Sequence, residues 1–276
     1  MSEKPPASRP EPGNGLEWFG RELEEALRHR GATQQELADA TGYKAPYVTK
    51  VKQGKALASL HFAEGCDRFF DTSGYFARTR TRISQHGHPE WFVPYLLLEE
   101  KAAQVLDFSP FLVMGILQTF AYAEALYRAA NPRYSDDVIK EKVTWRLQRR
   151  DILERPDPPL LWVVLDESCL RREVGGRPVM RGQMEHLLQM SETPNVTVQV
   201  LPFDSGAPPA AEPFTLLMFD DGSAPVLYSE AQGLGRVIDS ASVVATSTSR
   251  YERLRADALS PEKSLRALRE AIKEYA

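Results

Sequence analysis

The residues from Thr33 to Lys55, TQQELADATGYKAPYVTKVKQGK, constrain the fold more than any other part of the chain. Thr33 followed three positions later by Glu36 has the form of a capping box, which starts a helix by satisfying its first backbone N–H groups. Gly42 marks the end of that helix, because glycine accepts the positive φ of a left-handed cap. Further along, Val48 and Val51 share one face of a second helix. The stretch therefore predicts two short helices joined by a glycine turn.

The spacing within this stretch is that of a helix-turn-helix. Counted from Gln34, the fifth, ninth, fifteenth and eighteenth positions carry Ala38, Gly42, Val48 and Val51. The small Ala38 allows the helices to cross closely, and the two valines fix the next helix onto them. An ordinary helical hairpin with solvated lysines is the alternative, and it explains fewer of these coincidences. A preceding helix is predicted from apolar residues at helical spacing and a glycine cap, namely Phe19, Leu23, Ala26, Leu27 and Gly31.

Charge is distributed unevenly along the chain, whose formal net charge is −4. Residues 1–84 contain 13 basic and 11 acidic groups, a net of +2, so the remaining 21 basic and 27 acidic groups leave −6 for the rest. A surface rich in basic groups is typical of proteins that contact DNA phosphates. Duplex DNA is therefore an expected partner of the first segment, whose acid-free run contains Lys44, Lys50, Lys52 and Lys55.

Length and composition favour two domains. A chain of 276 residues with 42% hydrophobic content suits one small and one medium unit. We expect a disordered, proline-rich tail at 1–15, a helix-turn-helix domain at 16–84 and a larger domain at 85–276. Cys66 and Cys169 lack a CxxC partner, which argues against a disulfide framework and fits a reducing cytoplasm. No apolar run approaches the roughly 20 residues of a membrane-spanning helix, so we expect no membrane and a cytoplasmic protein that joins the nucleoid when bound to DNA.

The rest of the chain mixes helical and strand periods. Ile116, Phe120, Ala123 and Tyr127 indicate one helix, and further helices are predicted at 139–147, 178–188, 244–254 and 261–272. GLGRVI at 233–238 has two glycines of a dinucleotide fingerprint without the third, and we interpret it as a loop. The expected fold class is α+β overall, with an all-α N-terminal domain and a larger α+β C-terminal domain. The predicted strands are LLWVVL, TVQVL, FTLLMF and PVLYS.

The segments FGRELEEAL, TQQELADATGY and YVTKVKQGK resemble the Xre-type, phage-repressor-like DNA-binding domain. In that family the Gln that opens the second helix meets phosphate, and the first turns of the third helix meet base edges. The resemblance implies Gln34 as the phosphate contact. Lys55, in the same lysine run, is a further expected DNA contact. The groove-facing set that the resemblance implies is Lys44, Ala45, Pro46, Thr49 and Lys50.

The resemblance extends over the rest of the chain. EWFVPYLLLEEKAAQVLDFSPFLVMGILQTFAYAEAL, ILERPDPPLLWVVLDESCLRR, NVTVQVLPF, PFTLLMF and RADALSPEKSL are similar to a large actinobacterial group of two-domain regulators called WhiJ-like or antitoxin-like. In that group the C-terminal domain has no assigned chemistry, and members are commonly encoded beside a small acidic protein. The resemblance therefore implies a small acidic partner protein.

The third helix departs from the family pattern. Lys52 and Leu27 stand where the family has a Glu–Arg pair, and Lys44 stands where it has a capping Ser. A surface ion pair contributes about 0–1 kcal/mol and an N-cap roughly 0.5–2 kcal/mol, part of which Pro46 recovers with its preset φ. We therefore expect the fold to survive. Ala45 and Pro46 can make only apolar contacts with base edges. The polar residues that remain to recognise bases are Thr49 and Lys50.

No pattern in the sequence predicts an enzyme. The chain has no GKS or GKT phosphate loop, no HExxH and no GxSxG. Asp166 and Glu167 follow a predicted strand, where carboxylates can do acid–base work or simply end the strand in water, and the second interpretation is the better one. His86 and His88 form an HxH pair without further ligands. We expect no metal and no cofactor.

A helix-turn-helix unit reads only half of a DNA site, so we expect a homodimer. A separate expectation is that an acidic partner protein would need basic residues to contact. Candidates for the dimer interface are Tyr251, Leu254 and Leu268, for which core packing is equally compatible with the sequence. Each arginine cluster in the C-terminal domain is either a partner surface or is solvated or paired within the chain. The two clusters are Arg146, Arg149 and Arg150 on one helix, and Arg171, Arg172 and Arg177 after a strand.

The main functional hypothesis is a DNA-binding transcriptional regulator whose C-terminal domain receives a signal. Two other functions remain open. One is an antitoxin-like protein-interaction module whose degenerate third helix no longer selects operators. The other is a regulator that senses a small molecule.

Overall fold

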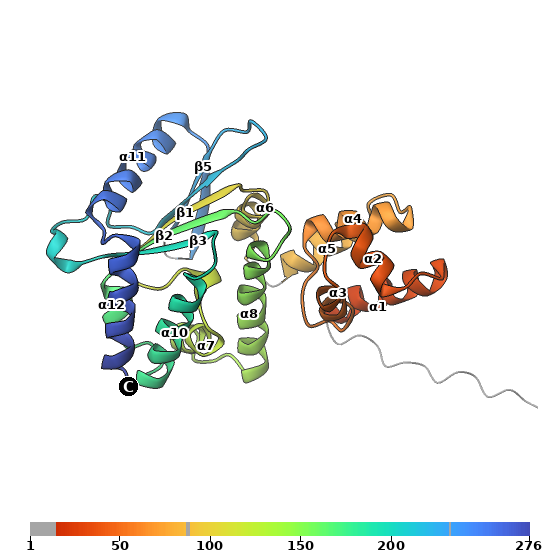
Figure 1. Cartoon of the computed structure of the whole chain (residues 1–276), viewed down its shortest axis with the longest axis horizontal. Helices are drawn as coiled ribbons and strands as arrows, with labels where there is room; N and C mark the ends of the chain where they lie inside the picture. Colours follow the sequence, from red (N-terminus) through yellow and green to blue (C-terminus); the bar gives the residue numbers. More distant parts are fainter. Residues whose placement is uncertain (1–14, 87–88, 232) are drawn as a thin grey trace, which may run out of the picture. The chain divides into compact units, whose positions relative to one another are not determined.

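A computed structural model describes residues 15–86, 89–231 and 233–276, except for the side chains of residues 84–86. The tail expected at 1–15 lies outside the described residues apart from Gly15, which begins the first helix. Contacts within the chain form two compact units, Met1–His86 and Gly87–Ala276. Figure 1 shows the helices of the first unit and the helices and sheet of the second.

Within its described residues, the first unit consists of five helices. These are α1 Gly15–Arg30, α2 Gln34–Thr41, α3 Ala45–Lys52, α4 Leu60–Phe70 and α5 Tyr75–His86.

The boundaries of α2 follow the local signals in the sequence. Thr33 Oγ1 accepts a hydrogen bond from the Glu36 backbone N–H at 3.2 Å, and the Thr33 N–H donates to Glu36 Oε2 at 2.7 Å. At the other end, Gly42 adopts φ 75°, and its N–H donates to the Ala38 carbonyl. The capping box and the glycine cap predicted from the sequence are both present.

The core of the first unit comes from the residues expected to face inward. Phe19 and Val51 are 1% exposed, and Leu23, Leu37, Ala38, Val48 and Phe62 are 0% exposed. Because both valines of α3 lie in this core, the opposite side of α3 is left at the surface. The α2–turn–α3 arrangement predicted from the spacing is therefore the arrangement of the structure.

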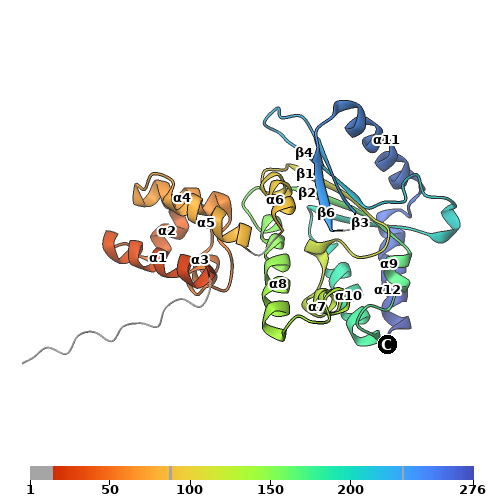
Figure 2. The same cartoon turned by 180° about the vertical axis from the view of Figure 1, so that it is seen from behind.

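The described part of the second unit contains a six-stranded sheet of order β3-β2-β1-β4-β5-β6 (Figures 1 and 2). β1, β2 and β3 are parallel, whereas β4, β5 and β6 form an antiparallel meander that joins the sheet on the other side of β1. The strands are β1 Gln104–Ser109, β2 Leu160–Asp166, β3 Val196–Leu201, β4 Phe214–Met218, β5 Val226–Ala231 and β6 Leu234–Ile238.

Helices cover both faces of this sheet. Figures 1 and 2 show α11 on one face and α7, α10 and α12 on the other. The helices are α6 Val93–Glu99, α7 Phe120–Ala130, α8 Asp136–Gln148, α9 Ser168–Arg171, α10 Arg177–Met190, α11 Ala241–Asp257 and α12 Pro261–Glu274. Short 3₁₀ turns are η1 Glu90–Phe92, η2 Gly115–Leu117, η3 Arg149–Leu153 and η4 Phe203–Ser205.

The alternation of side chains along β1 creates two separate cores. Val105 belongs to the larger core, with Met184 of α10 and Leu268 of α12. Phe108 points to the opposite face and packs in a core that includes Tyr251 of α11. Successive residues of a strand point to opposite faces, so the apolar residues of a strand covered on both sides divide between two cores. The predicted α+β fold class is confirmed.

The structure corrects several local interpretations. β1 was not predicted as a strand, and GLGRVI forms β6 instead of a loop. A Cβ at Gly235 of β6 would lie 2.7 Å from the Trp91 ring, so this glycine allows close packing against an aromatic side chain. Ile116 lies in η2, before the Thr119 cap that starts α7.

The proposed dimer interface residues also need correction. Tyr251, Leu254 and Leu268 are each 0% exposed, because Tyr251 and Leu254 pack beneath α11 and Leu268 packs beneath α12. These three residues therefore belong to the cores of their own chain.

A glycine at the contact between α1 and α3 provides a test of this packing. A Cβ at Gly20 would lie 2.9 Å from the Val51 carbonyl oxygen and closer still to that of Lys52. Helix propensity alone would make Gly→Ala stabilising by about 1 kcal/mol, but overpacking against backbone costs about 1–3 kcal/mol. We expect Gly20→Ala to lower the free energy of unfolding of the helical unit, measured by urea denaturation.

The matched control is Gly182→Ala in α10, where no neighbouring atom lies within 4 Å of the added Cβ. This variant should be more stable than the unmodified chain by about 0.5–1 kcal/mol. Stabilisation by both substitutions would contradict the close approach of α1 to α3.

Candidate nucleic-acid interface and buried polar sites

The outer side of α3 presents basic residues. Lys44, Lys50 and Lys55 are exposed, whereas Lys52 is half-buried. No acidic residue occurs between Asp39 and Glu64 in the sequence. Of the other residues expected to face a groove, Pro46 is exposed and Ala45 is half-buried. The surface of α3 is therefore cationic and has a small apolar element at its first turn.

The side chains of Gln34 and Thr49 are engaged at the junction of α2 and α3. Gln34 Nε2 donates to the Ala45 carbonyl at 2.8 Å and also contacts Thr49 Oγ1. Thr49 Oγ1 in turn donates to the Ala45 carbonyl at 3.0 Å. The amide nitrogen of Gln34 would have to leave these partners to meet a phosphate, so its role as a phosphate contact stays a prediction. Thr49 keeps its methyl group and spare acceptor capacity.

An aromatic contact fixes the start of α3, which has no side-chain cap. Lys44 is the N-cap residue, and its side chain makes no capping hydrogen bond. Instead the rings of Tyr43 and Tyr47 stack with centroids 4.5 Å apart, and both pack edge-on against Phe62. The Tyr47 hydroxyl accepts from the Ser59 backbone N–H at 2.8 Å. Sequence reasoning missed this device, although its visible signal was two tyrosines four positions apart, one before the N-cap and one in the first turn of α3.

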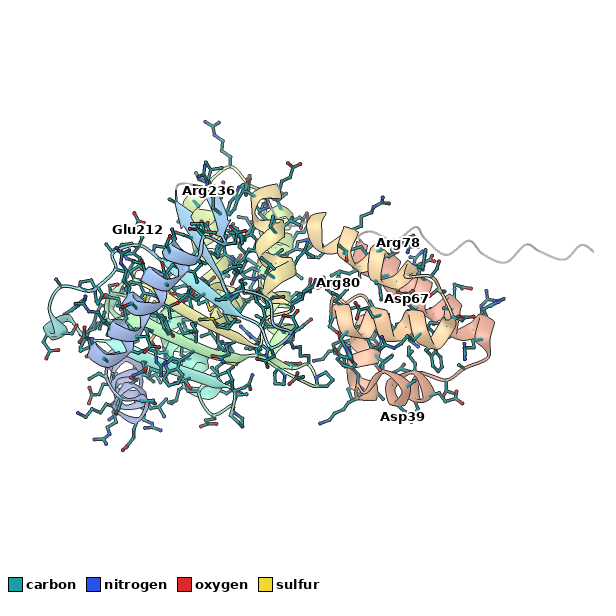
Figure 3. All side chains as sticks on the ribbon, turned by 90° about the horizontal axis from the view of Figure 1, so that it is seen from above. Asp39, Asp67, Arg78, Arg80, Glu212 and Arg236 are labelled. Atoms are coloured by element: carbon teal, nitrogen blue, oxygen red, sulfur yellow. The ribbon has the colours of Figure 1, made fainter. Side chains whose placement is uncertain are left out.

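The alternating arginines of α5 have different roles. Arg80 is 6% exposed, and its Nε donates to the Ala58 carbonyl at 2.8 Å, so it is an interior link between α5 and the segment before α4. Arg78 and Arg82 are exposed. Figure 3 labels Arg78 and Arg80. Three arginines at alternate positions spread around a helix, and Arg80 is the one that faces the interior. The His86 side chain and His88 lie outside the described residues.

Arg149, which was expected to meet a partner, is committed to Glu99. Its Nε and Nη2 donate to the two Glu99 carboxylate oxygens at 2.9 and 2.7 Å, and the side chains are 13% and 2% exposed. The Tyr95 hydroxyl donates to the same carboxylate at 2.5 Å. A buried ion pair needs such bidentate geometry and added hydrogen bonds to offset its desolvation. Arg149 therefore serves the interior of the unit.

The neighbouring arginines on α8 and η3 are also used within the chain. Arg150 donates to the carbonyls of Ile116 and Gln118 at 2.9 and 2.6 Å. Arg146 donates to Gln118 Oε1 at 3.0 Å, and its guanidinium lies 4.4 Å from the centroid of the Tyr127 ring. Of the two interpretations open from the sequence, pairing within the chain describes this first cluster.

The second cluster is more exposed. Arg171 forms ion pairs with Glu167, at 3.1 Å, and with Glu274. Arg177 donates to the Glu274 carbonyl and lies near Glu173. The Arg172 side chain is exposed and has no ion pair with any described residue. Within this cluster, Arg172 is thus the arginine whose charge no described carboxylate neutralises.

The acidic pair after β2 closes local turns. Asp166 Oδ1 accepts from the Ser168 N–H at 2.8 Å, and Glu167 Oε2 accepts from the Phe203 N–H at 3.0 Å. Both carboxylates therefore have structural partners in the backbone.

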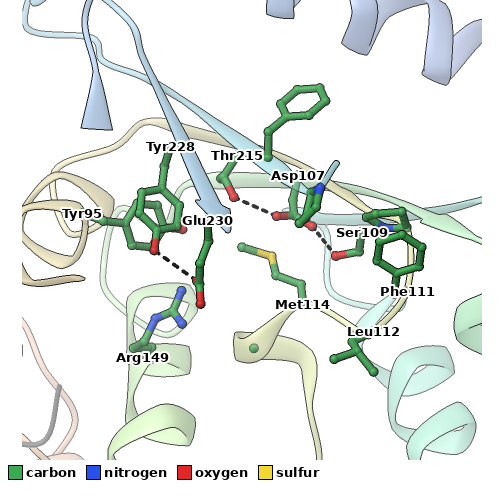
Figure 4. A pocket seen from close by; sticks show the side chains of 14 residues that line it. Tyr95, Asp107, Ser109, Phe111, Leu112, Met114, Arg149, Thr215, Tyr228 and Glu230 are labelled. Atoms are coloured by element: carbon green, nitrogen blue, oxygen red, sulfur yellow. Dashed lines mark hydrogen bonds between the residues drawn. The ribbon is translucent and has the colours of Figure 1, made fainter. Parts of the chain in front are cut away.

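Asp107 on β1 is a polar residue that sequence reasoning passed over. It is 6% exposed, and its carboxylate accepts from Ser109 Oγ at 2.6 Å and from Thr215 Oγ1 at 2.8 Å (Figure 4). Burial raises the pKa of Asp107 to about 6, although the two hydroxyl hydrogen bonds and Arg149 act in the opposite direction. The available signal was a single acid inside the apolar run VLDFS.

Known protein families match both units. Residues 18–75 match a family described as a helix-turn-helix domain, and a domain of this kind suggests a DNA-binding regulator. Residues 92–270 match the family described as Domain of unknown function (DUF5753), and the protein belongs to that family. No curated protein and no solved structure matches the chain. In the described part of the chain, no helix is both long enough and apolar enough to span a bilayer.

The raised pKa of Asp107 predicts a specific pH dependence. Because the native carboxyl binds its proton more tightly than the unfolded one, whose pKa is near 3.9, its contribution to stability is full below pH 4 and is lost as the pH rises through about 6. We expect the stability of Asp107→Asn relative to the unmodified chain to rise by roughly 2 kcal/mol from pH 4 to pH 7. Urea denaturation across this range measures it.

Asp239→Asn is the control, because Asp239 is exposed. Its stability should follow that of the unmodified chain at every pH. A constant difference between Asp107→Asn and the unmodified chain would show that Asp107 has no raised pKa.

Proposed function

We propose that the protein is a DNA-binding transcriptional regulator that places α3 in the major groove of an operator. The observation that supports this most is the surface of α3, where exposed Lys44 and Lys50 lie in a stretch without any carboxylate. The match of residues 18–75 to a helix-turn-helix domain supports the same orientation of α3. The alternative is an antitoxin-like protein-interaction module whose degenerate third helix no longer selects operators.

The proposed interface relies on phosphate contacts more than on base contacts. Lysines attract phosphates as point charges, and this sequence-independent attraction supplies much of the affinity. Ala45 and Pro46 can give only apolar contact, for example to a thymine methyl group. Specificity would then come largely from two half-sites about 34 Å apart, read by a homodimer. The proposal therefore includes two chains bound per operator.

The lysines of α3 provide the test. We expect Lys44→Glu/Lys50→Glu to weaken binding to every duplex and to reduce the slope of log affinity against log salt by about 2, since two phosphate contacts are lost. The measurement is fluorescence anisotropy with the DNA upstream of the protein's own gene, between 50 and 200 mM salt. Titration at high DNA concentration gives the number of chains bound.

The matched control is Lys140→Glu/Lys263→Glu, which makes the same change in net charge at exposed positions of the second unit. Its affinity and salt slope should stay close to those of the unmodified chain. Equal losses in both variants, or an unchanged affinity in the α3 variant, would contradict the assignment of α3 as the DNA-binding helix.

We also propose that the C-terminal unit receives the regulatory signal, and that the signal is a small acidic protein. The resemblance to WhiJ-like regulators supports this, as does a length far beyond what DNA binding needs. Arg172 carries an exposed, uncompensated charge that could meet a carboxylate, whereas Arg149 is buried with Glu99. Complementary charge of this kind mainly speeds association.

The probe for this proposal is the small acidic protein that the resemblance predicts to be encoded beside the gene. We expect Arg172→Glu to slow its association with the full chain several-fold, measured by surface plasmon resonance, because attraction becomes repulsion. Arg250→Glu on α11 is the control, since Arg250 is also exposed, and its association rate should be unchanged. No binding to the unmodified chain would contradict the partner, and equal effects of the two variants would contradict the role of Arg172.

A further inference from the structure

A pocket of about 320 Å³ opens at the carboxyl end of β1 (Figure 4). Phe111, Leu112 and Met114, which follow β1, form part of its wall, and Phe214 and Thr215 at the start of β4 form another part. β1 is parallel to β2 and antiparallel to β4, so strand direction changes beside the pocket. In open sheets of this type, ligands bind at the carboxyl ends of strands where the order of the chain switches. The volume is in the range of small-molecule sites.

A buried carboxylate without a counter-ion lines this pocket. Asp107 accepts hydrogen bonds only from the hydroxyls of Ser109 and Thr215, and no described residue forms an ion pair with it. A carboxylate has about four acceptor sites, so acceptor capacity remains. Buried charges are normally paired with an opposite charge, because desolvation is otherwise uncompensated. The wall of the pocket therefore presents an acceptor that a ligand can use.

The charges around the pocket favour a cation over an anion. Among the described residues that line it, Arg149 is the one cation, and both Nε and Nη2 of its guanidinium are bound to Glu99. Glu230 adds an exposed carboxylate, which accepts from the Tyr228 hydroxyl at 3.1 Å. An anionic ligand would meet two carboxylates and an arginine that is already neutralised. A cationic ligand would be attracted by both carboxylates.

The remaining lining suits an apolar body. Phe111 and Leu112 are 54% and 39% exposed, which is unusual for adjacent large apolar residues, and Met114 lies on the pocket wall. The rings of Tyr95 and Tyr228, which also line the pocket, have centroids 4.2 Å apart. Aromatic faces attract cations as well as apolar groups. The pocket thus combines an acidic interior with apolar and aromatic walls.

We propose that this pocket binds a small organic cation, namely a protonated amine with a compact apolar or aromatic body. Its ammonium group pairs with Asp107 and supplies the counter-ion that the buried carboxylate lacks. Its body packs against Phe111, Leu112 and Met114, and Glu230 gives a second attraction for positive charge. The residues that line the pocket include neither Arg172 nor any residue of α3, so the site can be tested without DNA or a partner protein.

Three compounds of similar shape test the chemical class of the ligand. 2-Phenylethylamine is the cationic probe, with 2-phenylethanol as its neutral and 3-phenylpropionate as its anionic counterpart. Each is titrated into the full chain in a calorimeter at pH 7.5, above the pKa of about 6 of Asp107, so that the carboxylate is ionised. We expect the amine to bind at least about tenfold more tightly than the alcohol, because a charge-assisted hydrogen bond replaces a neutral one. The propionate should bind most weakly.

Variants identify the residue that makes the amine bind more tightly than the alcohol. Asp107→Asn should reduce the amine-to-alcohol preference to about two- to threefold, which is the part that Glu230 supplies. The unfolding measurements above check that this variant folds. Glu230→Gln, at an exposed position, should weaken the amine only about two- to threefold, as expected for a solvated charge. Asp239→Asn, exposed and outside the pocket lining, is the control and should bind like the unmodified chain.

Four outcomes would overturn the proposal. They are an amine that does not bind at millimolar concentration, an amine that binds no more tightly than the alcohol, a propionate that binds most tightly, and an amine affinity that Asp107→Asn leaves unchanged. None of them bears on DNA binding by α3, so a failure here is distinguishable from a failure of the proposed regulator.

Discussion

The register of β1 is the constraint on which the C-terminal unit depends. This strand forms hydrogen bonds to the parallel β2 and to the antiparallel β4, and it separates the two cores. A slip of one residue would exchange the faces of all its side chains. Val105 would then leave the larger core, and Asp107 would lose Thr215, its partner across the strand pair. The pocket and its polar group exist because the register is fixed by burial on both sides.

The same unit contains two buried carboxylates that are stabilised differently. Glu99 has a bidentate arginine and a tyrosine hydroxyl, so its charge is compensated inside the fold. Asp107 accepts hydrogen bonds from two hydroxyls and pairs with no cation among the described residues, and burial raises its pKa. A compensated pair serves structure, since removing either partner leaves a buried charge. An uncompensated carboxylate on a pocket wall can instead bind a ligand. This contrast connects the packing of the sheet with a binding function.

The helical unit meets a related requirement at the start of α3. Lys44 provides no capping hydrogen bond, but the stacked tyrosines Tyr43 and Tyr47 anchor the turn to the start of α4. Their partners there are the N-cap residue Ser59 and Phe62 in the helix. An aromatic contact inside the core replaces the missing polar cap. The start of α3 therefore does not depend on its outward-facing side chains, and these positions can be lysines and a proline. For this reason an atypical sequence can still form a helix with a cationic surface.

The sequence alone determined the local features of this protein. Capping and glycine signals gave the limits of α2, and apolar spacing gave the core residues of the helix-turn-helix and four strands of the sheet. β1 and β6 were not predicted as strands, because Asp107 interrupts the apolar run of β1, and Gly235 and Arg236 interrupt that of β6. Only tertiary structure decided what the charged residues do. Arg149 meets Glu99 across 50 positions, and Asp107 meets Thr215 across 108. Local periodicity shows which face of an element is apolar, whereas the partner of a buried charge depends on which distant element packs against it.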